Sequence, residues 1–259
     1  MEKLLRISGL TKHFGGVIAC EDLSFDIDAG RIVGVIGPNG AGKTTLFNLI
    51  TGAYPPTAGE IVFNGEPIHA KRPDIIAKKG ISRTFQNIRL FKNLSLRDNI
   101  IIALDMNNTH YSFFSNLIQS GSVRKKEREL KSLAMEYLEV VGLAEKAMDR
   151  ADSLPYGLQR KLEIARALAL QPKLLLLDEP AAGMNPEESM DLAALVRSVK
   201  EAYNLTVILI EHHMNVVMDL CDNIVVVNFG RKLAEGTPRQ IQNDPDVIKA
   251  YLGGKSENA

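Results

Sequence analysis

Apolar residues along the chain occur in two patterns, continuous runs that are typical of buried strands and a regular spacing that is typical of helices. KLLLLD (173–178) and LTVILIE (205–211) are continuous apolar runs, as expected for strands buried on both faces of a sheet. The β-branched run RIVGVIG (31–37) leads into a glycine-rich turn and then a helical stretch closed by Gly52. Because such stretches alternate in the first and last thirds of the chain, we predict an α/β fold, a mixed sheet core covered by helices.

Two tight turns add antiparallel hairpins to this picture. GEIVFNGEPI (59–68) carries Asn64-Gly65, the strongest short-range hairpin signal, between two strand-like segments. NIVVVNFGRKLAEG (223–236) reads as a second strand and hairpin near the other end of the chain. We therefore expect an antiparallel β portion near the N-terminus in addition to the mixed sheet.

The middle of the chain carries only the helical period. Ser95 and Asp98 have capping-box spacing before NIIIALDM, and apolar positions 130, 133, 134, 137, 138 and 141 share one helix face that stops at Gly142. The sequence thus predicts an all-helical subdomain over residues 87–172. It would be inserted into a catalytic core made of residues 1–86 and 173–259, within one domain that spans 1–259.

Charge narrows the classes of function. The 31 basic residues balance the 31 acidic residues, so the formal net charge is zero. A general nucleic-acid-binding protein would carry a basic excess or a basic stripe, so we expect no nucleic acid among the partners.

Cysteine usage and hydropathy suggest where the protein works. Cys20 and Cys221 lie far apart without metal-ligand spacing, and MEKLLRISGL at the start lacks the apolar stretch of a signal peptide, which favours the reducing cytosol. The apolar runs IIIAL (100–104) and LLLL (174–177) fall far short of the roughly 18 residues that span a bilayer. Any membrane role is therefore expected to be peripheral.

A phosphate-binding loop is the strongest chemical signal. GPNGAGKTT (37–45) fits GxxxxGK[ST] directly after a strand and before a helix, the context that the motif requires. Its glycines let successive N–H groups face a phosphate at the positive end of the helix; the alternative is a simple glycine-rich turn. Lys43 would reach the β- and γ-phosphates, Thr44 would bind Mg²⁺, and Thr45 would lie near the α-phosphate. The predicted nucleotide-binding set is Gly37, Pro38, Asn39, Gly40, Ala41, Gly42, Lys43, Thr44 and Thr45.

An acidic pair supplies the second half of a nucleotide site. LLLLDEP (174–180) is a strand that ends in two adjacent carboxylates, at the sheet edge where α/β folds bind ligands. Asp178 can hold Mg²⁺ through water. Glu179 is then free to act as the general base toward the attacking water.

These motifs, in this order and with LPYGLQRKLEIARAL (154–168) between them, resemble the ATP-binding cassette (ABC) family over nearly the whole chain. The resemblance implies a P-loop NTPase of the ABC type that hydrolyses ATP with Mg²⁺. In that family two cassettes close head to tail, and each ATP lies between one phosphate loop and the partner's signature loop, usually LSGGQ. Here LPYGL occupies that place, so the resemblance assigns Pro155, Tyr156 and Gly157 to the nucleotide of the partner.

Three further positions match the family pattern. Phe14 in LTKHFGG would stack on adenine, with packing in a core as the alternative. Gln86 in RTFQN would contact Mg²⁺ and water and relay contact with the transmembrane subunits. His212 in LIEHHM would contact the γ-phosphate as the switch histidine, although the neighbouring His213 leaves the assignment open. The implied catalytic residues are Lys43, Gln86, Glu179 and His212, and the implied metal ligands are Thr44, Gln86 and Asp178.

Short loops narrow the resemblance further. AAGMNP, LIEHHM, TFQNIRLF and NDPDVIKAYLG look most like the ATPase subunits of bacterial branched-chain amino acid importers. The insertion YSFFSNLIQSGSVRKKERE also fits this subgroup, although its charge run fits a solvated helix face equally well.

The narrower resemblance implies a set of partners. They are a second ATPase subunit, non-identical in the transporter with a homodimer possible in isolation, and transmembrane permeases. The permeases are expected to dock near Leu90 and Phe91 in NIRLF (87–91), with a small core contact of these two apolar residues as the equal alternative. A periplasmic or extracellular solute-binding protein would be an indirect partner. The chain would then lie at the cytoplasmic face of the cell membrane as a peripheral subunit.

Two departures from the family pattern keep alternatives open. Pro155 replaces the signature serine and has neither a hydroxyl nor an N–H to donate, and Asn185 replaces an aspartate but is also a good helix N-cap before Pro186.

The alternatives are an ABC ATPase for another solute, such as lipopolysaccharide export, and a non-transport cassette for DNA repair, chromosome structure or translation. A nucleotide-responsive module that hardly hydrolyses ATP is the third.

Overall fold

The computed structural model describes residues 3–107 and 120–253 and divides into two compact units. Met1–Arg83 and Lys173–Ala259 form one unit, called the core unit below, and Thr84–Pro172 form the other, the helical unit. Gln86 therefore lies in the helical unit, three residues after the last residue of the first core segment.

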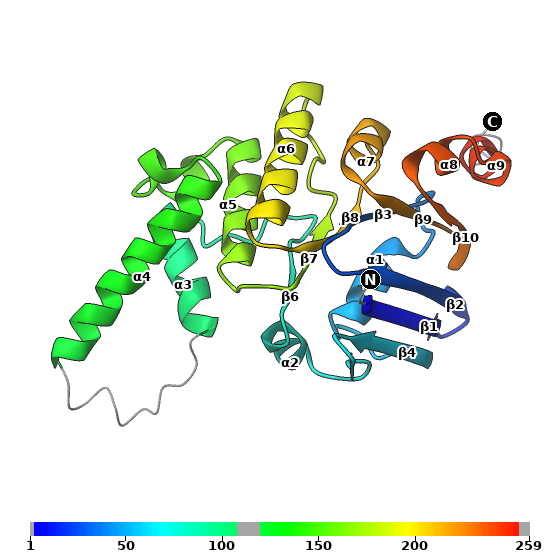
Figure 1. Ribbon diagram of the computed structural model, residues 1–259, viewed down its shortest axis with the longest axis horizontal. Coiled ribbons are helices and arrows are strands. Elements are labelled where there is room, and N and C mark those ends of the chain that lie inside the picture. Colours follow the sequence, from blue (N-terminus) through cyan, green and yellow to red (C-terminus); the bar gives the residue numbers. More distant parts are fainter. Residues whose placement is uncertain (1–2, 108–119, 254–259) are drawn as a thin grey trace. The chain divides into compact units, whose positions relative to one another are not determined.

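A six-stranded sheet forms the centre of the core unit, as the apolar runs predict (Figure 1). Its order is β10-β9-β3-β8-β7-β6, and β9, β3, β8, β7 and β6 run parallel while β10 is antiparallel to β9. Every residue of β3, β7 and β8 is buried, which explains why these segments have no polar alternation. The strands are β3 (Ile32–Ile36), β6 (Ile81–Arg83), β7 (Leu174–Asp178), β8 (Thr206–Ile210), β9 (Asn223–Asn228) and β10 (Arg231–Gly236).

The predicted antiparallel portion is a second sheet with the order β2-β1-β4-β5. Its β4–β5 hairpin turns at Asn64 and Gly65, whose φ angles of 49° and 77° are those of the tight turn that Asn-Gly favours. The hairpin between β9 and β10 turns in the same way at Phe229 and Gly230. The strands of the second sheet are β1 (Lys3–Phe14), β2 (Val17–Asp28), β4 (Ala58–Phe63) and β5 (Glu66–Pro67).

Helices cover both faces of the central sheet. Leu46 and Phe47 of α1 belong to one buried cluster with side chains from both sheets, so α1 packs between them. Figure 1 places α6 and α7 on the opposite face, where a Cβ at Gly34 of β3 would approach Val217 and Cys221 within 3.2 Å. The helices of the core unit are α1 (Lys43–Ile50), α2 (Pro73–Lys78), α6 (Pro186–Ala202), α7 (Met214–Leu220), α8 (Pro238–Gln242) and α9 (Pro245–Gly253).

The helical unit contains α3 (Leu96–Asn107), α4 (Ser120–Val140) and α5 (Tyr156–Leu168), with short 3₁₀ helices at Ala144–Lys146 and Ala151–Ser153. The predicted cap is present, because the Asp98 N–H donates to Ser95 Oγ at 3.0 Å. The predicted apolar face is largely buried, while Leu133 is 38 % exposed. Residues 111–119 of the subgroup-like insertion lie outside the described residues, and its charged residues 125–129 lie on a mostly solvated part of α4.

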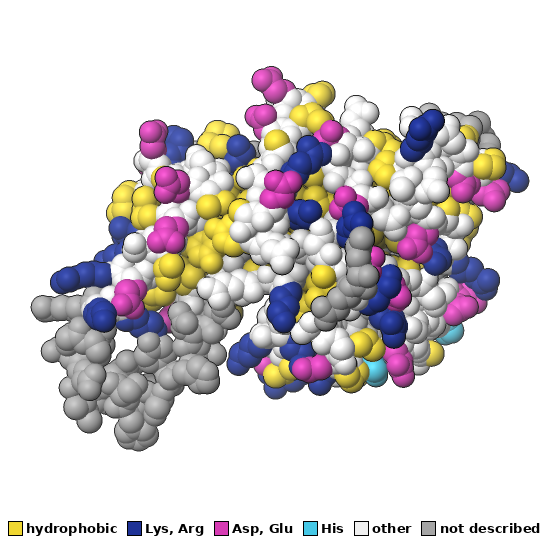
Figure 2. Space-filling model, viewed as in Figure 1, with side chains coloured by type: hydrophobic (Ala, Val, Ile, Leu, Met, Phe, Trp, Pro, Cys, Tyr) yellow, Lys and Arg dark blue, Asp and Glu magenta, His cyan; other side chains and the backbone are white. Residues whose placement is uncertain are grey.

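Charge and hydropathy of the described residues fit the expectations from composition. On the face drawn in Figure 2, acidic and basic side chains are interspersed among the described residues. None of the helices described is both long and apolar enough to cross a membrane.

Candidate functional site

The phosphate loop lies between β3 and α1, and close backbone approach requires glycine at two of its positions. A Cβ at Gly37 would lie 1.9 Å from the Val227 carbonyl oxygen, and one at Gly42 would lie 2.3 Å from the Ala19 carbonyl oxygen. Gly42 also has a φ of 101°, a conformation that other residues rarely adopt. The structure therefore explains two glycines of the motif by the fit of the loop against neighbouring chain segments, independently of any ligand.

Lys43 begins α1 and folds back over the loop. Its Nζ donates to the carbonyl oxygens of Gly37 at 2.8 Å and Pro38 at 2.9 Å, and only 6 % of the residue is exposed. Burial lowers the pKa of Lys43, while the charges of Glu179 and Asp178 act in the opposite direction. The opposite charges therefore influence one another within the core unit, and their common role in a nucleotide site stays a prediction.

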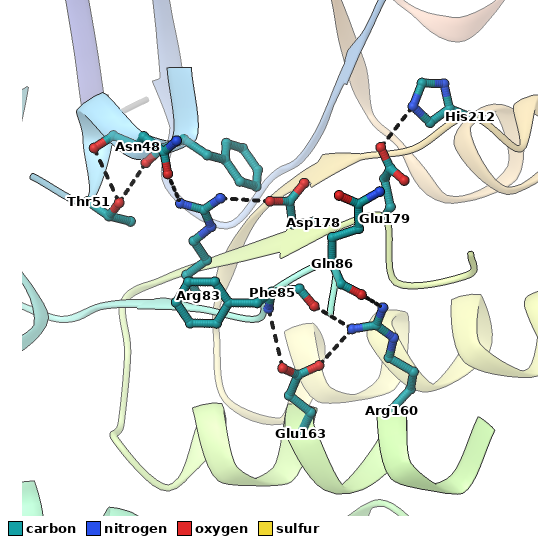
Figure 3. Close-up of polar contacts among 11 residues, drawn as sticks. Asn48, Thr51, Arg83, Phe85, Gln86, Arg160, Glu163, Asp178, Glu179 and His212 are labelled. Atoms are coloured by element: carbon teal, nitrogen blue, oxygen red, sulfur yellow. Dashed lines mark hydrogen bonds and ion pairs between the residues drawn. The ribbon is translucent and has the colours of Figure 1, made fainter. Parts of the chain in front are cut away.

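The acidic pair lies at the carboxyl end of β7. Glu179 adopts a left-handed φ of 48°, and its N–H donates to the Ile210 carbonyl of the neighbouring strand at 2.9 Å. This backbone turn aims the side chain toward His212, whose Nε2 lies 2.9 Å from Glu179 Oε1 (Figure 3). The carboxylate is 18 % exposed and the imidazole 40 %, so solvent reaches both groups.

His212 is held in place by Glu211, a residue that the sequence reasoning missed. Glu211 ends the apolar run of β8 and is only 2 % exposed. Its Oε2 accepts the N–H groups of His212 at 2.9 Å and His213 at 3.1 Å, while its Oε1 accepts the Ala181 N–H at 2.7 Å. One carboxylate thus ties the segment after the acidic pair to the histidine loop. A charged residue directly after a buried strand is the only signal in the sequence that marks it.

Asp178 has a partner that the sequence reasoning also missed. Nη2 of Arg83, the last residue of β6, donates to Asp178 Oδ2 at 2.7 Å, and Nη1 donates to Asn48 Oδ1 of α1 at 2.7 Å (Figure 3). The guanidinium carbon also lies 5.5 Å from the centre of the Phe47 ring. Arg83 therefore connects β6, β7 and α1 around the carboxylate.

The donor atoms beside the phosphate loop fit Mg²⁺. Thr44 is exposed and Thr45 half-buried in the first turn of α1, which follows β3, and Asp178 ends β7 in the same sheet. Hydroxyl and carboxylate oxygens are the ligands that Mg²⁺ prefers, and this ion commonly takes its remaining ligands from substrate phosphates and water. Within the described ranges, no group of three or more His, Cys, Asp and Glu forms a metal site by itself. This arrangement suits an ion that binds together with a nucleotide.

Phe14 lies at the end of β1 and is 41 % exposed, so the alternative of a core phenylalanine is wrong. Its ring meets the Tyr54 ring edge-on at a centroid distance of 5.2 Å, and Lys12 Nζ lies 5.0 Å from its centre. An exposed aromatic surface with a neighbouring cation can accept a flat polar ring such as adenine.

The signature-like segment lies at the start of a helix. α5 begins at Tyr156, with Pro155 as N-cap and no side-chain cap. The Pro155 carbonyl accepts the N–H groups of Leu158 and Gln159, each at 3.0 Å. Tyr156 and Gly157 therefore form the first turn of the helix, because proline needs no N–H donor at this boundary.

The remaining predicted positions lie on loops and caps. Gln86 is exposed in the segment that follows β6 and enters the helical unit. Asn185 caps α6 in a capping box: its Oδ1 accepts the Glu188 N–H at 2.9 Å, and Glu188 Oε2 accepts the Asn185 N–H at 3.0 Å. The local interpretation of Asn185 is thus confirmed.

Comparison with known families gives two matches. A family model described as ABC transporter matches residues 20–182. A second model, described as branched-chain amino acid ATP-binding cassette transporter, matches residues 231–256.

Several known proteins align with this chain over nearly its full length. The high-affinity branched-chain amino acid transport ATP-binding protein BraF of Pseudomonas aeruginosa is 48 % identical over 250 residues, covering 96 % of this chain and 98 % of BraF. LivG of Escherichia coli, with the same description, is 44 % identical over 252 residues, covering 97 % of this chain and 98 % of LivG. The lipopolysaccharide export system ATP-binding protein LptB of Escherichia coli is 32 % identical over 254 residues, covering 96 % and 97 %.

Solved structures show the same fold. The ADP conformation of MJ1267, an ATP-binding cassette of an ABC transporter, superimposes with a TM-score of 0.84 at 30 % identity, covering 98 % of this chain and all of that one. A dimeric post-hydrolysis state of the cassette MJ0796 bound to ADP and Pi gives a TM-score of 0.76 at 25 % identity, covering 91 % and 99 %.

Proposed function

Because the chain belongs to the ABC transporter family, we propose that it is the ATP-hydrolysing subunit of an importer for branched-chain amino acids. The observation that carries the catalytic part is the sheet topology: the phosphate loop follows β3 and the acidic pair ends β7, so both lie at the carboxyl edge of parallel strands that are separated only by β8. The match of residues 231–256 and the identities to BraF and LivG support the substrate class.

ATP binding begins at the phosphate loop. The N–H groups of the loop between Gly37 and Gly42, except at Pro38, and those at the start of α1 receive the phosphates, and Lys43 exchanges the carbonyl oxygens of Gly37 and Pro38 for phosphate oxygens. Phe14 stacks on the adenine. The exposed ring of Phe14 and the buried position of Lys43 support these roles.

Hydrolysis depends on Glu179. Its carboxylate accepts a proton from the water that attacks the γ-phosphate, and its hydrogen-bonding distance of 2.9 Å to His212 keeps the carboxylate oriented. His212, held through Glu211, also contacts the γ-phosphate. Positioning and electrostatics thus account for most of the acceleration, as in other phosphoryl transfers.

Thr44 and Asp178 would hold Mg²⁺. When bound, the ion neutralises charge that develops on the phosphate oxygens. Arg83 orients the carboxylate of Asp178 for this role through the contact at 2.7 Å.

The cassette works as one half of a pair at the cytoplasmic face of the cell membrane. Pro155, Tyr156 and Gly157 at the start of α5 contact the ATP held by a second, non-identical cassette. Permease subunits dock on the segment around Leu90 and Phe91, and a solute-binding protein delivers the amino acid to them. The 47 % exposure of Phe91, whose ring lies 5.6 Å from the Arg166 guanidinium, supports a docking role.

The rival proposals are less well supported. Lipopolysaccharide export has a relative at 32 % identity, below the 48 % and 44 % of the amino acid transport proteins. A non-transport cassette would have to explain the match at 231–256 and the balanced charge. A module that hardly hydrolyses ATP would leave the orientation of Glu179 toward His212 without a purpose.

Uptake by whole cells tests this proposal. A strain that lacks this chain should lose high-affinity uptake of labelled leucine, isoleucine and valine at low external concentration, while arginine uptake stays unchanged. Expression of the wild-type chain should restore it. Unchanged uptake of all three amino acids in the deletion strain would refute the substrate class.

A further inference from the structure

A buried arginine in the helical unit is not explained by the roles assigned so far. Arg160 lies on α5 and is 1 % exposed. It is the largest of the fully buried side chains among the described residues. A buried guanidinium costs several kcal/mol unless it is paired and hydrogen-bonded. Its partners therefore indicate what the residue is for.

The partners of Arg160 join two separate segments of the helical unit. Nη1 donates to the Phe85 carbonyl oxygen at 2.5 Å and to Glu163 Oε2 at 2.8 Å, and Nη2 donates to the Gln86 carbonyl oxygen. Nη2 also donates to the Tyr156 hydroxyl at 2.9 Å. Figure 3 shows the guanidinium between α5 and the backbone of Phe85 and Gln86.

Glu163 completes the contact from the same helix. It is 3 % exposed, and its Oε1 accepts the Phe85 N–H at 3.3 Å while Oε2 accepts from Arg160. The backbone at Phe85 is thus held through both its carbonyl and its N–H group. Arg160 and Glu163, one turn apart, form a fixed pair, which we call the α5 clamp.

The geometry points to a coupling role. We propose that Arg160 is a positioning residue through which the α5 clamp moves the Gln86 segment together with the first turn of α5. This inference rests on the proposed function. It means that when Tyr156 and Gly157 contact the partner's ATP, the Gln86 segment changes its position at the same time. Tyr156 and Arg160 are four residues apart on one helix, so the connection is rigid.

The residue types fit this role closely. Arginine offers two terminal nitrogens in a planar fork, and here they serve two carbonyls, a carboxylate and a phenol at once. Lysine carries a single ammonium point and cannot reproduce that spread. Arg160→Lys should therefore separate the two segments while keeping the positive charge.

Hydrogen–deuterium exchange on the assembled transporter tests the coupling. Peptides covering residues 84–90 and 155–159 are followed with and without a slowly hydrolysed ATP analogue plus Mg²⁺. In wild type, the analogue should slow exchange in both peptides. In the Arg160→Lys variant and in the double variant Arg160→Met with Glu163→Met, the analogue should still slow exchange in peptide 155–159. In peptide 84–90 of both variants, the analogue should change the exchange rate less than about twofold.

Controls separate coupling from a loss of structure. The double methionine variant removes the pair without leaving a buried charge, so it should fold, and Tyr156→Phe removes only one hydroxyl and should give a partial loss. Lys131→Met, which removes the exposed ion pair with Glu127 on α4, should behave as wild type. Loose packing alone would raise exchange equally with and without the analogue.

The outcomes distinguish the coupling from the proposed function. If both peptides of both clamp variants respond to the analogue as in wild type, the coupling role of Arg160 is refuted and the ATPase role stands. If neither peptide of the wild-type complex responds to the analogue, the composite ATP site is refuted, and the coupling with it.

Discussion

Arg83 and Asp178 form a buried ion pair of 2.7 Å between neighbouring strands, with side chains only 8 % and 4 % exposed. Asp178 ends β7, and Arg83 ends β6, which runs parallel to it in the sheet. The second contact of Arg83, with Asn48, ties the pair to the helix that starts at the phosphate loop. The carboxylate assigned to Mg²⁺ is therefore oriented by a residue that immediately precedes the helical unit.

Replacing Arg83 by glutamine should destabilise the core unit. Removing one partner of a buried pair leaves an uncompensated charge, so we expect the free energy of unfolding to fall by about 3 kcal/mol. Urea unfolding measures this change, and the Mg²⁺ concentration for half-maximal ATP hydrolysis should rise in parallel. Arg197→Gln, which breaks the exposed pair with Asp219, is the control and should cost less than about 1 kcal/mol. Equal losses in the two variants would contradict the account.

Replacing Lys43 by alanine should remove ATP binding. The ammonium group makes charge-assisted hydrogen bonds worth about 1.5 to 3 kcal/mol each, so the Kd for ATP should rise on the order of a hundredfold. Titration with a fluorescent ATP analogue measures it. Lys78→Ala, on the solvent face of α2, should leave the Kd unchanged. Tight ATP binding by the Lys43 variant would remove that residue from the site.

Local signals explain which parts of the site the sequence could predict. The phosphate loop lies within nine consecutive residues, and the acidic pair directly follows a buried strand. Arg83 and Asp178 are 95 residues apart in sequence, and their contact depends on β6 pairing with β7. No period or spacing specifies that pairing, so Arg83 could not be recognised. Glu211 was missed for the same reason, because it contacts the segment after Glu179 only once β7 and β8 lie side by side.

The sequence predicted most of the fold but not every boundary. Continuous apolar runs identified β3, β7 and β8, and two turn motifs identified the hairpins. No side-chain cap marks the start of α5, because Pro155 has no acceptor group in its side chain, yet the helix begins directly after this residue. Leu133 fits the helical period of its neighbours, but exposure is decided by which elements cover a face, and nothing in the local sequence encodes that.

His212 and His213 should differ sharply in their effect on hydrolysis. His212→Ala removes the group that lies 2.9 Å from Glu179, so kcat for ATP hydrolysis should fall roughly ten- to a hundredfold with little change in ATP affinity. His213 is the matched control, because its ring lies 3.7 Å from Glu211 and not at Glu179. Steady-state phosphate release from both variants decides the assignment that the sequence left open. A larger loss from His213→Ala would reverse it.

Replacing Pro155 by serine should tighten ATP-driven closure. The serine hydroxyl would restore a donor toward the partner's γ-phosphate, where one such bond is worth about 1.5 to 3 kcal/mol. Chemical crosslinking across the two cassettes at increasing ATP concentration measures closure. Pro155→Ala is the control, since it removes the ring without adding a hydroxyl. Identical closure curves for the two variants would show that the proline does not weaken this composite site.

Phosphate release by the assembled transporter, with its solute-binding protein loaded with leucine, is the most direct test of the central claim that Glu179 drives transport through ATP hydrolysis. Glu179→Gln keeps the size of the side chain but removes the base, so ATP should bind as in wild type while turnover falls by about a hundredfold or more, the range that general acid–base catalysis typically contributes. Glu187→Gln, an exposed change in the first turn of α6, is the matched control and should keep full turnover. Near-normal phosphate release by the Glu179→Gln transporter, with ATP bound, would contradict the mechanism proposed for this protein.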